Sequence, residues 1–247
     1  MQLKGKVVIV TGGGRGIGKA ACLLLAARGA TVVVNYLSNH RAAESVVSNI
    51  RSADGEAISL QADVRSQEQF SQLVASVKEA YGRIDGLVCN ANMNFAAKPF
   101  AEMTWEEFSQ KLNDELQAAF VTTKAVIPSM MEQKAGRIIY ISSSLGKNPS
   151  PYMIAHGTAK GGLDSFSSYI AQEFGPQGVT ANVVAPGLVQ TDATAFLSDT
   201  DRQMIINFTP LRRVANPDDV AGAIAFLIGD DSRFVTGTYL PVTGGKF

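Results

Sequence analysis

A glycine-rich segment near the start of the chain, residues 11–18, has the composition of a phosphate-binding turn. Its sequence TGGGRGIG follows a β-branched run and precedes an alanine- and leucine-rich helical pattern. Glycines let backbone amides approach a pyrophosphate, and the positive end of the helix dipole adds to the attraction. The strict G-x-G-x-x-G pattern does not fit, because Ile17 stands where its third glycine would be. T-G-x-x-x-G-x-G does fit, on Gly12, Gly16 and Gly18. An ordinary tight turn also uses glycines, but the position in a βαβ unit favours a nucleotide site.

The end of the second strand pattern indicates which nucleotide is bound. NAD sites usually carry an acidic residue there for the ribose hydroxyl. This chain has Asn35 followed by Tyr-Leu-Ser38, with no carboxylate. Arg15 and Ser38 could instead hold a 2′-phosphate, although Arg15 could also be a solvated loop cation. With Asn35 beside them, these residues favour NADP(H) over NAD(H) as the cofactor.

Short β-branched runs alternate with longer helical patterns along the chain, as in repeated βαβ units. Several of the runs are almost wholly apolar, as expected for strands covered by helices on both faces. Strands are predicted at 7–11, 31–35, 57–61, 86–89, 137–141, 180–185 and 239–242, and helices near 16–28, 40–53, 67–80, 105–131, 156–174 and 218–228. The prediction is a Rossmann-type α/β fold, with a doubly wound parallel sheet in a single domain, residues 1–247.

Local signals mark some helix boundaries. Ser66 with Gln69, and Thr104 with Glu107, have the spacing of a capping box at a helix start. Pro128 should end or kink the helix near 105–131, because proline lacks the amide of an internal helical residue.

Composition excludes several classes of partner. The chain has 22 basic and 22 acidic residues and no basic run, which argues against nucleic-acid binding. Its longest apolar run, residues 20–27, is far shorter than the ~20 residues of a membrane span. The start of the sequence lacks a signal-peptide pattern, and Cys22 and Cys89 have no pairing or metal-ligand spacing. We expect a cytoplasmic protein with no metal and no membrane partner.

The chain resembles the short-chain dehydrogenase/reductases, particularly the β-ketoacyl-carrier-protein reductases, over essentially its whole length. The resemblance rests on the glycine-rich segment and on Ala62-Asp63-Val64, Cys89-Asn90-Ala91, residues 136–143, Lys160, residues 182–187 and Thr191-Asp192.

The resemblance implies a role for each matched position. Asp63 would contact the adenine, and Asn90 would support the cofactor site. The Pro186-Gly187 turn and Thr191 would hold the nicotinamide carboxamide, Lys160 would bind the nicotinamide ribose, and Ser143 would bind the substrate carbonyl. It also places Ile17, Val64 and Ala91 at the cofactor.

Two positions depart from the family's catalytic Asn-Ser-Tyr-Lys tetrad. The Y-x-x-x-K tyrosine is His156, and counting from Ser143 leads to the same residue. Aligning Leu116 and Phe120 with the family's N-L-x-x-x-F pattern puts Glu115 in place of the asparagine. The expectations for fold and cofactor survive these changes, whereas the catalytic expectation does not survive intact.

His156 could serve as the proton donor, because imidazole titrates near neutral pH. Its shorter side chain counts against a simple exchange with tyrosine, and Lys160 one turn away would lower its pKa. A neutral His156 could still donate one hydrogen bond. His156 could equally be a harmless replacement in a chain whose chemistry lies elsewhere.

Tyr152 offers a second route, eight residues before Lys160. Enoyl-thioester reductases of this superfamily often use an upstream tyrosine, typically one residue nearer to the lysine. Tyr152 could be such a donor or an aromatic lid over the substrate.

Glu115 would be costly if buried without a partner. It could pair with Lys160 and lock it, or act as a base in a different reaction. We expect a contact from Glu115 to Lys160 or to His156.

Substrate specificity in this family comes mainly from the segment after Thr191, here residues 193–210. This segment would form a lid, and its apolar side chains could line an acyl cleft or belong to the core; they are Phe196, Leu197, Met204, Ile205, Ile206 and Phe208, joined by Met93, Phe95 and Met153. The resemblance implies that the helices near 105–131 and 156–174 pair across interfaces of a homodimer or homotetramer, although their apolar faces could be buried within one chain.

The leading hypothesis is an NADPH-dependent oxidoreductase that reduces a carbonyl or enoyl group, plausibly of an acyl-carrier-protein or CoA thioester. Ser143 would orient the substrate, and His156 or Tyr152 would replace the usual proton donor. A cofactor-binding protein with little redox activity is one alternative. The other is an enzyme repurposed for dehydration, isomerisation or cyclisation, with His156 and Glu115 as its acid–base pair.

Overall fold

A single seven-stranded sheet organises the computed structural model, which describes residues 2–195 and 197–246. The strand order is β3-β2-β1-β4-β5-β6-β7, and each neighbouring pair is parallel. The strands are β1 (Val7–Val10), β2 (Thr31–Tyr36), β3 (Glu56–Gln61), β4 (Gly86–Cys89), β5 (Gly136–Ile141), β6 (Val179–Pro186) and β7 (Tyr239–Val242). The predicted strands are all present, with ends that differ by one residue at most.

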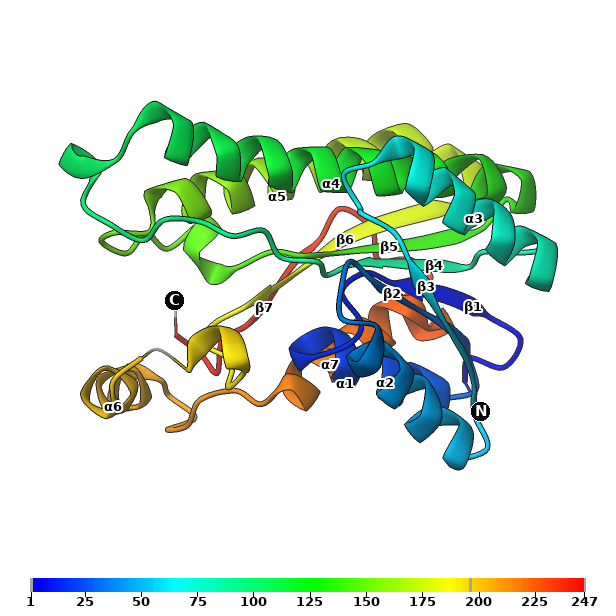
Figure 1. The fold of residues 1–247 in the computed structure, drawn as a ribbon, viewed down its shortest axis with the longest axis horizontal. Helices are drawn as coiled ribbons and strands as arrows, with labels where there is room; N and C mark the ends of the chain where they lie inside the picture. Colours follow the sequence, from blue (N-terminus) through cyan, green and yellow to red (C-terminus); the bar gives the residue numbers. More distant parts are fainter. Residues whose placement is uncertain (1, 196, 247) are drawn as a thin grey trace.

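Helices cover both faces of the sheet (Figure 1). One layer contains α1 (Gly16–Ala27), α2 (His40–Ser52) and α7 (Pro217–Ile228), and the other contains α3 (Gln67–Tyr81), α4 (Trp105–Gln133) and α5 (Ile154–Phe174). A further helix, α6 (Asp199–Phe208), lies outside these layers, at the same end of the molecule as the start of α4. This arrangement confirms the predicted doubly wound, single-domain α/β fold.

The alternation of side chains along β1 explains why helices cover both faces. Val8 and Val10 pack into the core beneath α1, α2 and α7, whereas Val7 and Ile9 pack into the core beneath α3, α4 and α5. All four side chains are buried. A strand that is apolar at every position therefore has a hydrophobic layer on each side.

The predicted helix boundaries need two corrections. Thr104 and Glu107 form the full capping box, but at Ser66 only half of it exists, since the Gln69 side chain accepts from the amide of Asp63 instead. Pro128 does not end its helix, because α4 continues to Gln133. The buried neighbours of Pro128 stabilise these last turns through packing and outweigh the missing amide bond; they are Val126, Ile127 and Met130.

α6 has no counterpart among the predicted helices. Its cap is local, since Ser198 accepts from the amide of Asp201. None of its described side chains is buried, so the hydrophobic periodicity that marks core-packed helices is weak here.

The far end of α4 is fixed to the residue that leads into β4. The Gln133 side chain accepts from the Ile84 amide at 3.0 Å and donates to the Ile84 carbonyl at 3.0 Å. One side chain thus satisfies both backbone groups of Ile84 and sets the position of α4 along the sheet.

The strand order reverses between β1 and β4. The chain proceeds from β1 to β2 and β3 on one side, then returns to place β4 on the other side of β1. Loops that leave the carboxyl ends of β1 and β4 therefore diverge, which opens a crevice for ligands in sheets of this kind. Among the described helices, none has the length and apolarity needed to cross a membrane.

A pair of glycine substitutions tests the fold between α5 and β6. Gly178 has φ +81°, and a Cβ there would lie 2.2 Å from the Lys134 carbonyl oxygen. We expect Gly178→Ala to lower the free energy of unfolding by about 2–4 kcal/mol through strain and overpacking. Gly175→Ala is the matched control, because its Cβ would meet nothing within 4 Å and its φ is −54°.

Urea unfolding of the two variants measures this difference. The control should stay within about 0.5 kcal/mol of the wild-type protein. Equal effects of the two substitutions would contradict the steric argument.

Candidate functional site

The glycine-rich segment forms a close turn between β1 and α1. Gly12 and Gly16 have φ of +62° and +52°, conformations that L side chains rarely adopt. A Cβ at Gly18 would lie 2.4 Å from the Gly12 carbonyl oxygen and 2.5 Å from Nδ2 of Asn90. The glycines that fit the T-G-x-x-x-G-x-G pattern are therefore each required by the backbone, and α1 begins at Gly16 with its amides free for an anion.

Asn90 and Thr11 join this turn to the end of β4. Nδ2 of Asn90 donates to the carbonyl oxygens of Thr11 and Gly12, at 2.9 and 3.2 Å. The Thr11 hydroxyl accepts from the backbone amides of Asn90 and Ala91, at 2.9 and 3.0 Å. These bonds fix the glycine turn against the loop after β4, at the point where the strand order reverses.

The loop after β6 lies against the opposite side of the glycine turn. A Cβ at Gly16 would lie 3.3 Å from Cγ2 of Thr191. Pro186 ends β6, and the Gly187 amide donates to the Val242 carbonyl at 3.0 Å. The structure thus brings Thr191 beside the glycine turn, and this small, amide-rich cradle fits a dinucleotide pyrophosphate.

The residues predicted at the adenosine end occupy different environments. Arg15 and Ser38 are exposed. Asn35 is only 1% exposed, and its Nδ2 donates to the Leu60 and Ala62 carbonyls at 3.3 and 3.1 Å. The side chain of Asn35 therefore links β2 to β3, and this position does not support a side-chain contact with a cofactor. Ile17 is partly buried and packs against the core beneath α1, and its contact with a cofactor remains a prediction.

Asp63 is engaged by Arg65, a residue that had no predicted role. Oδ1 of Asp63 accepts from Nε of Arg65 at 3.1 Å, and Oδ2 accepts from Nη2 at 2.8 Å. The hydrogen bond from Arg65 holds the pKa of Asp63 below its ordinary value. Arg65 also pairs with Asp114 on α4 at 3.2 Å. The adenine contacts of Asp63 and of its buried neighbour Val64 remain predictions.

Glu115 lies between two buried lysines. Its Oε1 accepts from Nζ of Lys160 at 2.6 Å, and its Oε2 accepts from Nζ of Lys111 at 2.6 Å. The Lys160 ammonium also donates to the Ile141 carbonyl at 2.8 Å. The expected contact between Glu115 and Lys160 is present, and Lys111 is a second cation that the sequence reading did not identify.

The two lysines determine the charge state of Glu115. Burial raises the pKa of the carboxyl group, but the charges of Lys160 and Lys111 outweigh burial and hold the pKa at about 2. Burial also lowers the pKa of the Lys111 ammonium, while the charge of Glu115 opposes this shift. Glu115 is therefore a carboxylate at neutral pH and is paired on both oxygens.

His156 is almost fully enclosed, with 9% of its surface exposed. The Phe95 ring stacks on its imidazole, with centroids 4.5 Å apart and planes 27° apart. Nδ1 of His156 is buried and has no hydrogen-bond partner among the described residues. Burial, followed by the charges of Lys160 and Lys111, lowers the pKa of His156 to about 3. His156 is therefore neutral at physiological pH, a group that can donate a hydrogen bond but carries no charge.

Ser143 caps a short turn that packs tightly on α5. Its hydroxyl oxygen accepts from the Leu145 amide at 3.2 Å, so its proton is free to donate elsewhere. A Cβ at Gly157 would lie 2.8 Å from the Leu145 carbonyl oxygen. This close approach holds the turn of Ser143 against the helical turn that carries His156.

Tyr152 differs from these residues because its side chain is 58% exposed. Its φ of +67° is unusual for a residue with a side chain, and its carbonyl accepts from the Lys98 amide at 3.1 Å. Tyr152 therefore connects the loop before α5 to the loop before α4, with its ring in solvent.

An open groove of about 720 Å³ runs along α6, between residues 190–199 and 212–216. Ile206 and Thr191 are among its lining residues, whereas Met204 and Phe208 on α6 are exposed. The segment predicted as a lid thus borders a groove next to the glycine turn. Phe196 lies outside the described residues. Within residues 2–195 and 197–246, no cluster of His, Cys, Asp and Glu side chains could hold a metal ion.

Lys111 was missed for a definable reason. The sequence shows it four residues before Glu115, the spacing at which a lysine and a glutamate meet on a helix. The family's tetrad points only to partners for Glu115 on the later helix, at His156 and Lys160. The cost of burying a carboxylate makes a cation on its own helix an equally good candidate.

Comparisons with known proteins agree with this geometry. A family model described as Enoyl-(Acyl carrier protein) reductase matches residues 12–246. A 3-oxoacyl-[acyl-carrier-protein] reductase of Synechocystis is 40% identical over 98% of this chain and 97% of its own. An acetoacetyl-CoA reductase of Allochromatium vinosum is 39% identical over 98% of both chains. The crystal structure of a Sinorhizobium meliloti dehydrogenase/reductase superposes with a TM-score of 0.91, at 33% identity over 99% of this chain and 96% of that one.

The neutral state of His156 can be tested by NMR, because the chain has only two histidines. We expect the imidazole signals of His156 to stay unchanged from pH 7.5 to about 4.5, since its pKa is about 3. The variant His40→Gln identifies which signals belong to His156. A midpoint near 6.5 would show that the site does not exclude the charged imidazole.

The same shift predicts a pH dependence of stability. The unfolded chain binds a proton at His156 near pH 6.5, whereas the folded chain binds it near pH 3. The free energy of unfolding should therefore fall as the pH drops from about 6.5 towards about 3. His156→Phe keeps an aromatic ring for the stack but has no group that titrates. Urea unfolding should therefore show a smaller fall in the free energy of unfolding from pH 7 to pH 5 in this variant than in the wild-type protein.

Proposed function

The chain belongs to the short-chain dehydrogenase/reductase family, and we propose that it is an NADPH-dependent reductase of the 3-oxo group of an acyl thioester. The thioester would be carried by acyl-carrier protein or CoA. The observation that carries the proposal is the glycine cradle, which Asn90 ties to the loop after β4. Relatives named for 3-oxoacyl and acetoacetyl substrates support the substrate class.

Separate groups would bind the parts of the cofactor. The backbone around Gly12, Gly16 and Gly18 would hold the pyrophosphate, and the exposed Arg15 and Ser38 would hold the 2′-phosphate. Pro186, Gly187 and Thr191 would receive the nicotinamide carboxamide, and Asp63 and Val64 would line the adenine. Lys160 would bind the nicotinamide ribose with the donor that Glu115 and Ile141 leave free. Bound NADPH would supply the hydride.

The chain's own side chains would stabilise the reacting oxygen. Ser143 has a free hydroxyl proton, because its oxygen already accepts from Leu145. His156 would donate an N–H hydrogen bond as a neutral imidazole, a group that can polarise a carbonyl without carrying charge. The Lys160 ammonium nearby would favour the negative charge that develops on the oxygen. In this mechanism His156 occupies the tyrosine position of the tetrad but works mainly by hydrogen bonding, and the proton that the reduced oxygen gains would come from solvent water.

Reduction of an enoyl thioester is the second candidate. The matching family model is described as an enoyl reductase, and Tyr152 stays available as an upstream donor. Its exposed ring leaves the hydroxyl accessible to a substrate. A cofactor-binding protein without redox activity and an enzyme of non-redox acid–base chemistry are the outcomes to separate from both.

Assembly and location complete the proposal. Phe120 on α4 and Tyr169 on α5 are large, exposed apolar side chains on the two helices expected to pair between subunits. We therefore expect a homodimer or homotetramer. The proposed location of the protein is the cytoplasm.

Turnover assays with two substrates test the proposed reaction. We expect NADPH oxidation with a 3-oxoacyl thioester, and a loss of roughly 100-fold in kcat for Ser143→Ala and for His156→Phe. Tyr152→Phe is the matched control and should stay within about twofold on this substrate.

The same assay with an enoyl thioester tests the second candidate function. Turnover of this substrate alone, abolished by Tyr152→Phe, would replace the proposal with enoyl reduction. Tight NADPH binding with no turnover of either substrate would favour the non-redox alternatives.

Cofactor preference has its own test in fluorescence titrations with NADPH and NADH. Arg15→Ala removes one charged partner of the proposed 2′-phosphate, so Kd for NADPH should rise by roughly 10- to 100-fold. Kd for NADH should change by less than about threefold, because NADH lacks that phosphate. A parallel loss of both cofactors would contradict the role of Arg15.

A further inference from the structure

Three charged side chains meet at the centre of the site, and one of them, Lys111, has no counterpart in the family's tetrad. Lys111 and Glu115 lie one turn apart on α4, and Lys160 reaches them from α5. Exposure of the Lys111 side chain is 0%, and that of the other two is 5% each. Such a burial is tolerated only when every charge is paired and hydrogen-bonded.

We propose that Lys111 is a positioning residue of the active site, which preserves the positive charge at Lys160 and holds the loop after β4 over His156. This inference rests on the proposed function, since a positioning residue presupposes a reaction at the site. The contacts of Lys111 that support it do not depend on whether the protein reduces a substrate.

The first part of the argument concerns charge. A carboxylate beside Lys160 alone would cancel the cation that the proposed mechanism needs at the reacting oxygen. Lys111 supplies a second cation, so the three side chains together carry a net charge of +1. That is the charge of a lysine beside the neutral asparagine expected at the position of Glu115. Lys111 therefore compensates for Glu115.

The second part concerns geometry. Each oxygen of Glu115 has its own lysine at 2.6 Å, so the carboxylate cannot turn both oxygens towards Lys160. The Lys111 ammonium has two further acceptors, the Met93 carbonyl at 2.8 Å and Oδ1 of Asn92 at 3.2 Å. All three of its N–H groups are thus used, which fixes the side chain in one position.

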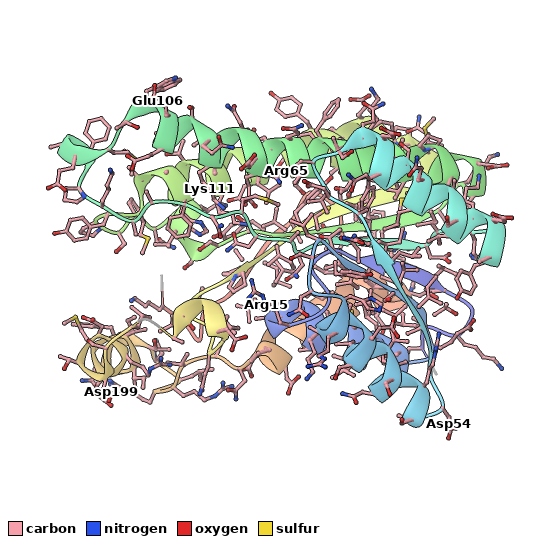
Figure 2. The ribbon with its side chains drawn as sticks, in the orientation of Figure 1. Arg15, Asp54, Arg65, Glu106, Lys111 and Asp199 are labelled. Atoms are coloured by element: carbon pink, nitrogen blue, oxygen red, sulfur yellow. The ribbon has the colours of Figure 1, made fainter. Side chains whose placement is uncertain are left out.

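The third part concerns the loop that follows β4. Asn92 and Met93 are bound by Lys111, and Phe95 stacks on His156 with a centroid distance of 4.5 Å. Nζ of Lys111 itself lies 5.5 Å from the centre of the Phe95 ring, within the range of a cation–π contact. In Figure 2, Lys111 is labelled on α4, in the helix layer across the sheet from Arg15.

Lys111 is thereby connected to both unusual positions of the tetrad. It acts on Lys160 through Glu115, and on His156 through the loop that carries Phe95. The charged groups that act on His156 are Lys160 on its own helix, and Lys111 and Glu115 on α4. Removal of Lys111 alone removes one of the cations that disfavour a charged imidazole.

Three variants and one control test the proposal. They are Lys111→Met, Glu115→Gln, the double variant, and Lys124→Met as a matched control on the same helix, where the lysine lies over the Phe120 ring. We expect the pKa of His156, measured by NMR, to rise by about one unit or more in Lys111→Met. It should stay near the wild-type value in the double variant, which removes one charge of each sign, and in Lys124→Met.

Urea unfolding and kinetics provide the other readouts. Each single variant should lower the unfolding midpoint. The double variant should recover most of that loss, because the net charge of the cluster returns to +1 and Lys160 keeps its bond to the Ile141 carbonyl. In Lys111→Met, kcat should fall at least ~10-fold while Kd for NADPH changes by less than about threefold. Lys124→Met should resemble the wild-type protein in all of these measurements.

The outcomes separate this inference from the proposed reaction. An unchanged pKa of His156 in Lys111→Met, or a double variant less stable than both single variants, would overturn the positioning role. A raised pKa and a recovered midpoint in a protein without reductase activity would uphold the role of Lys111 and reject the reaction instead.

A second variant covers the case in which Lys111→Met does not fold. Phe95→Ala leaves the three charges in place and removes only the ring over His156. It should raise the pKa of His156 by admitting water, with little change in the urea midpoint. An unchanged pKa in Phe95→Ala would show that the loop does not shield His156.

Discussion

The site depends on one constraint, which is that a carboxylate buried at Glu115 must be paired on both of its oxygens. Burial alone would favour the neutral acid, but two lysines at 2.6 Å keep the group ionised. Their arrangement fixes the ammonium of Lys160 and, through Lys111, the backbone of the loop after β4. The neutral state of His156 follows first from burial, to which the ring that this loop places over it contributes, and then from the same cations.

The cofactor side of the crevice is built differently, from backbone contacts rather than charges. The Thr11 hydroxyl and the Asn90 amide exchange bonds between the ends of two adjacent strands, and the glycines allow the chain to pass at distances that a Cβ would prevent. This half of the site contains the glycine turn on which the family resemblance rests. The half that contains His156 and Glu115 is held by charges and by a stacked ring instead. Binding of a dinucleotide and chemistry on a substrate therefore rest on separate sets of interactions.

The sequence predicted the fold well because the signals of the strands are strong and local. Alternating burial on two faces makes β1 apolar at each position, and the glycine turn identifies its end. α6 escaped prediction, since no described side chain on it is buried and its cap lies in its own first turn. At Pro128 the local preference of proline predicted a helix end or kink that the structure does not have. α4 continues to Gln133, because tertiary packing stabilises its last turns.

The prediction of the site stopped where contacts cross between elements. The contact of Glu115 with Lys160 could be anticipated, since both positions come from one motif. The burial of Asn35 between β2 and β3 could not, because the same residue type at a strand end serves equally as a ligand. Lys111 and Arg65 lie outside the family's motifs, and only the folded chain shows that Lys111 also binds the loop after β4 and that Arg65 also binds α4.

α4 is attached to the segments that flank β4 at two places, Lys111 and Gln133, which lie about six turns apart. Gln133 binds Ile84, two residues before the strand, and Lys111 binds Asn92 and Met93 after it. A helix fixed in this way has a set register, since sliding by one turn of ~5.4 Å would break both attachments at once. Lys111 thus holds one end of the loop that carries Phe95, at Met93, and the bond from the Lys98 amide to the Tyr152 carbonyl holds the other end. The long helix acts as a stationary frame for the few loop residues between these two attachments.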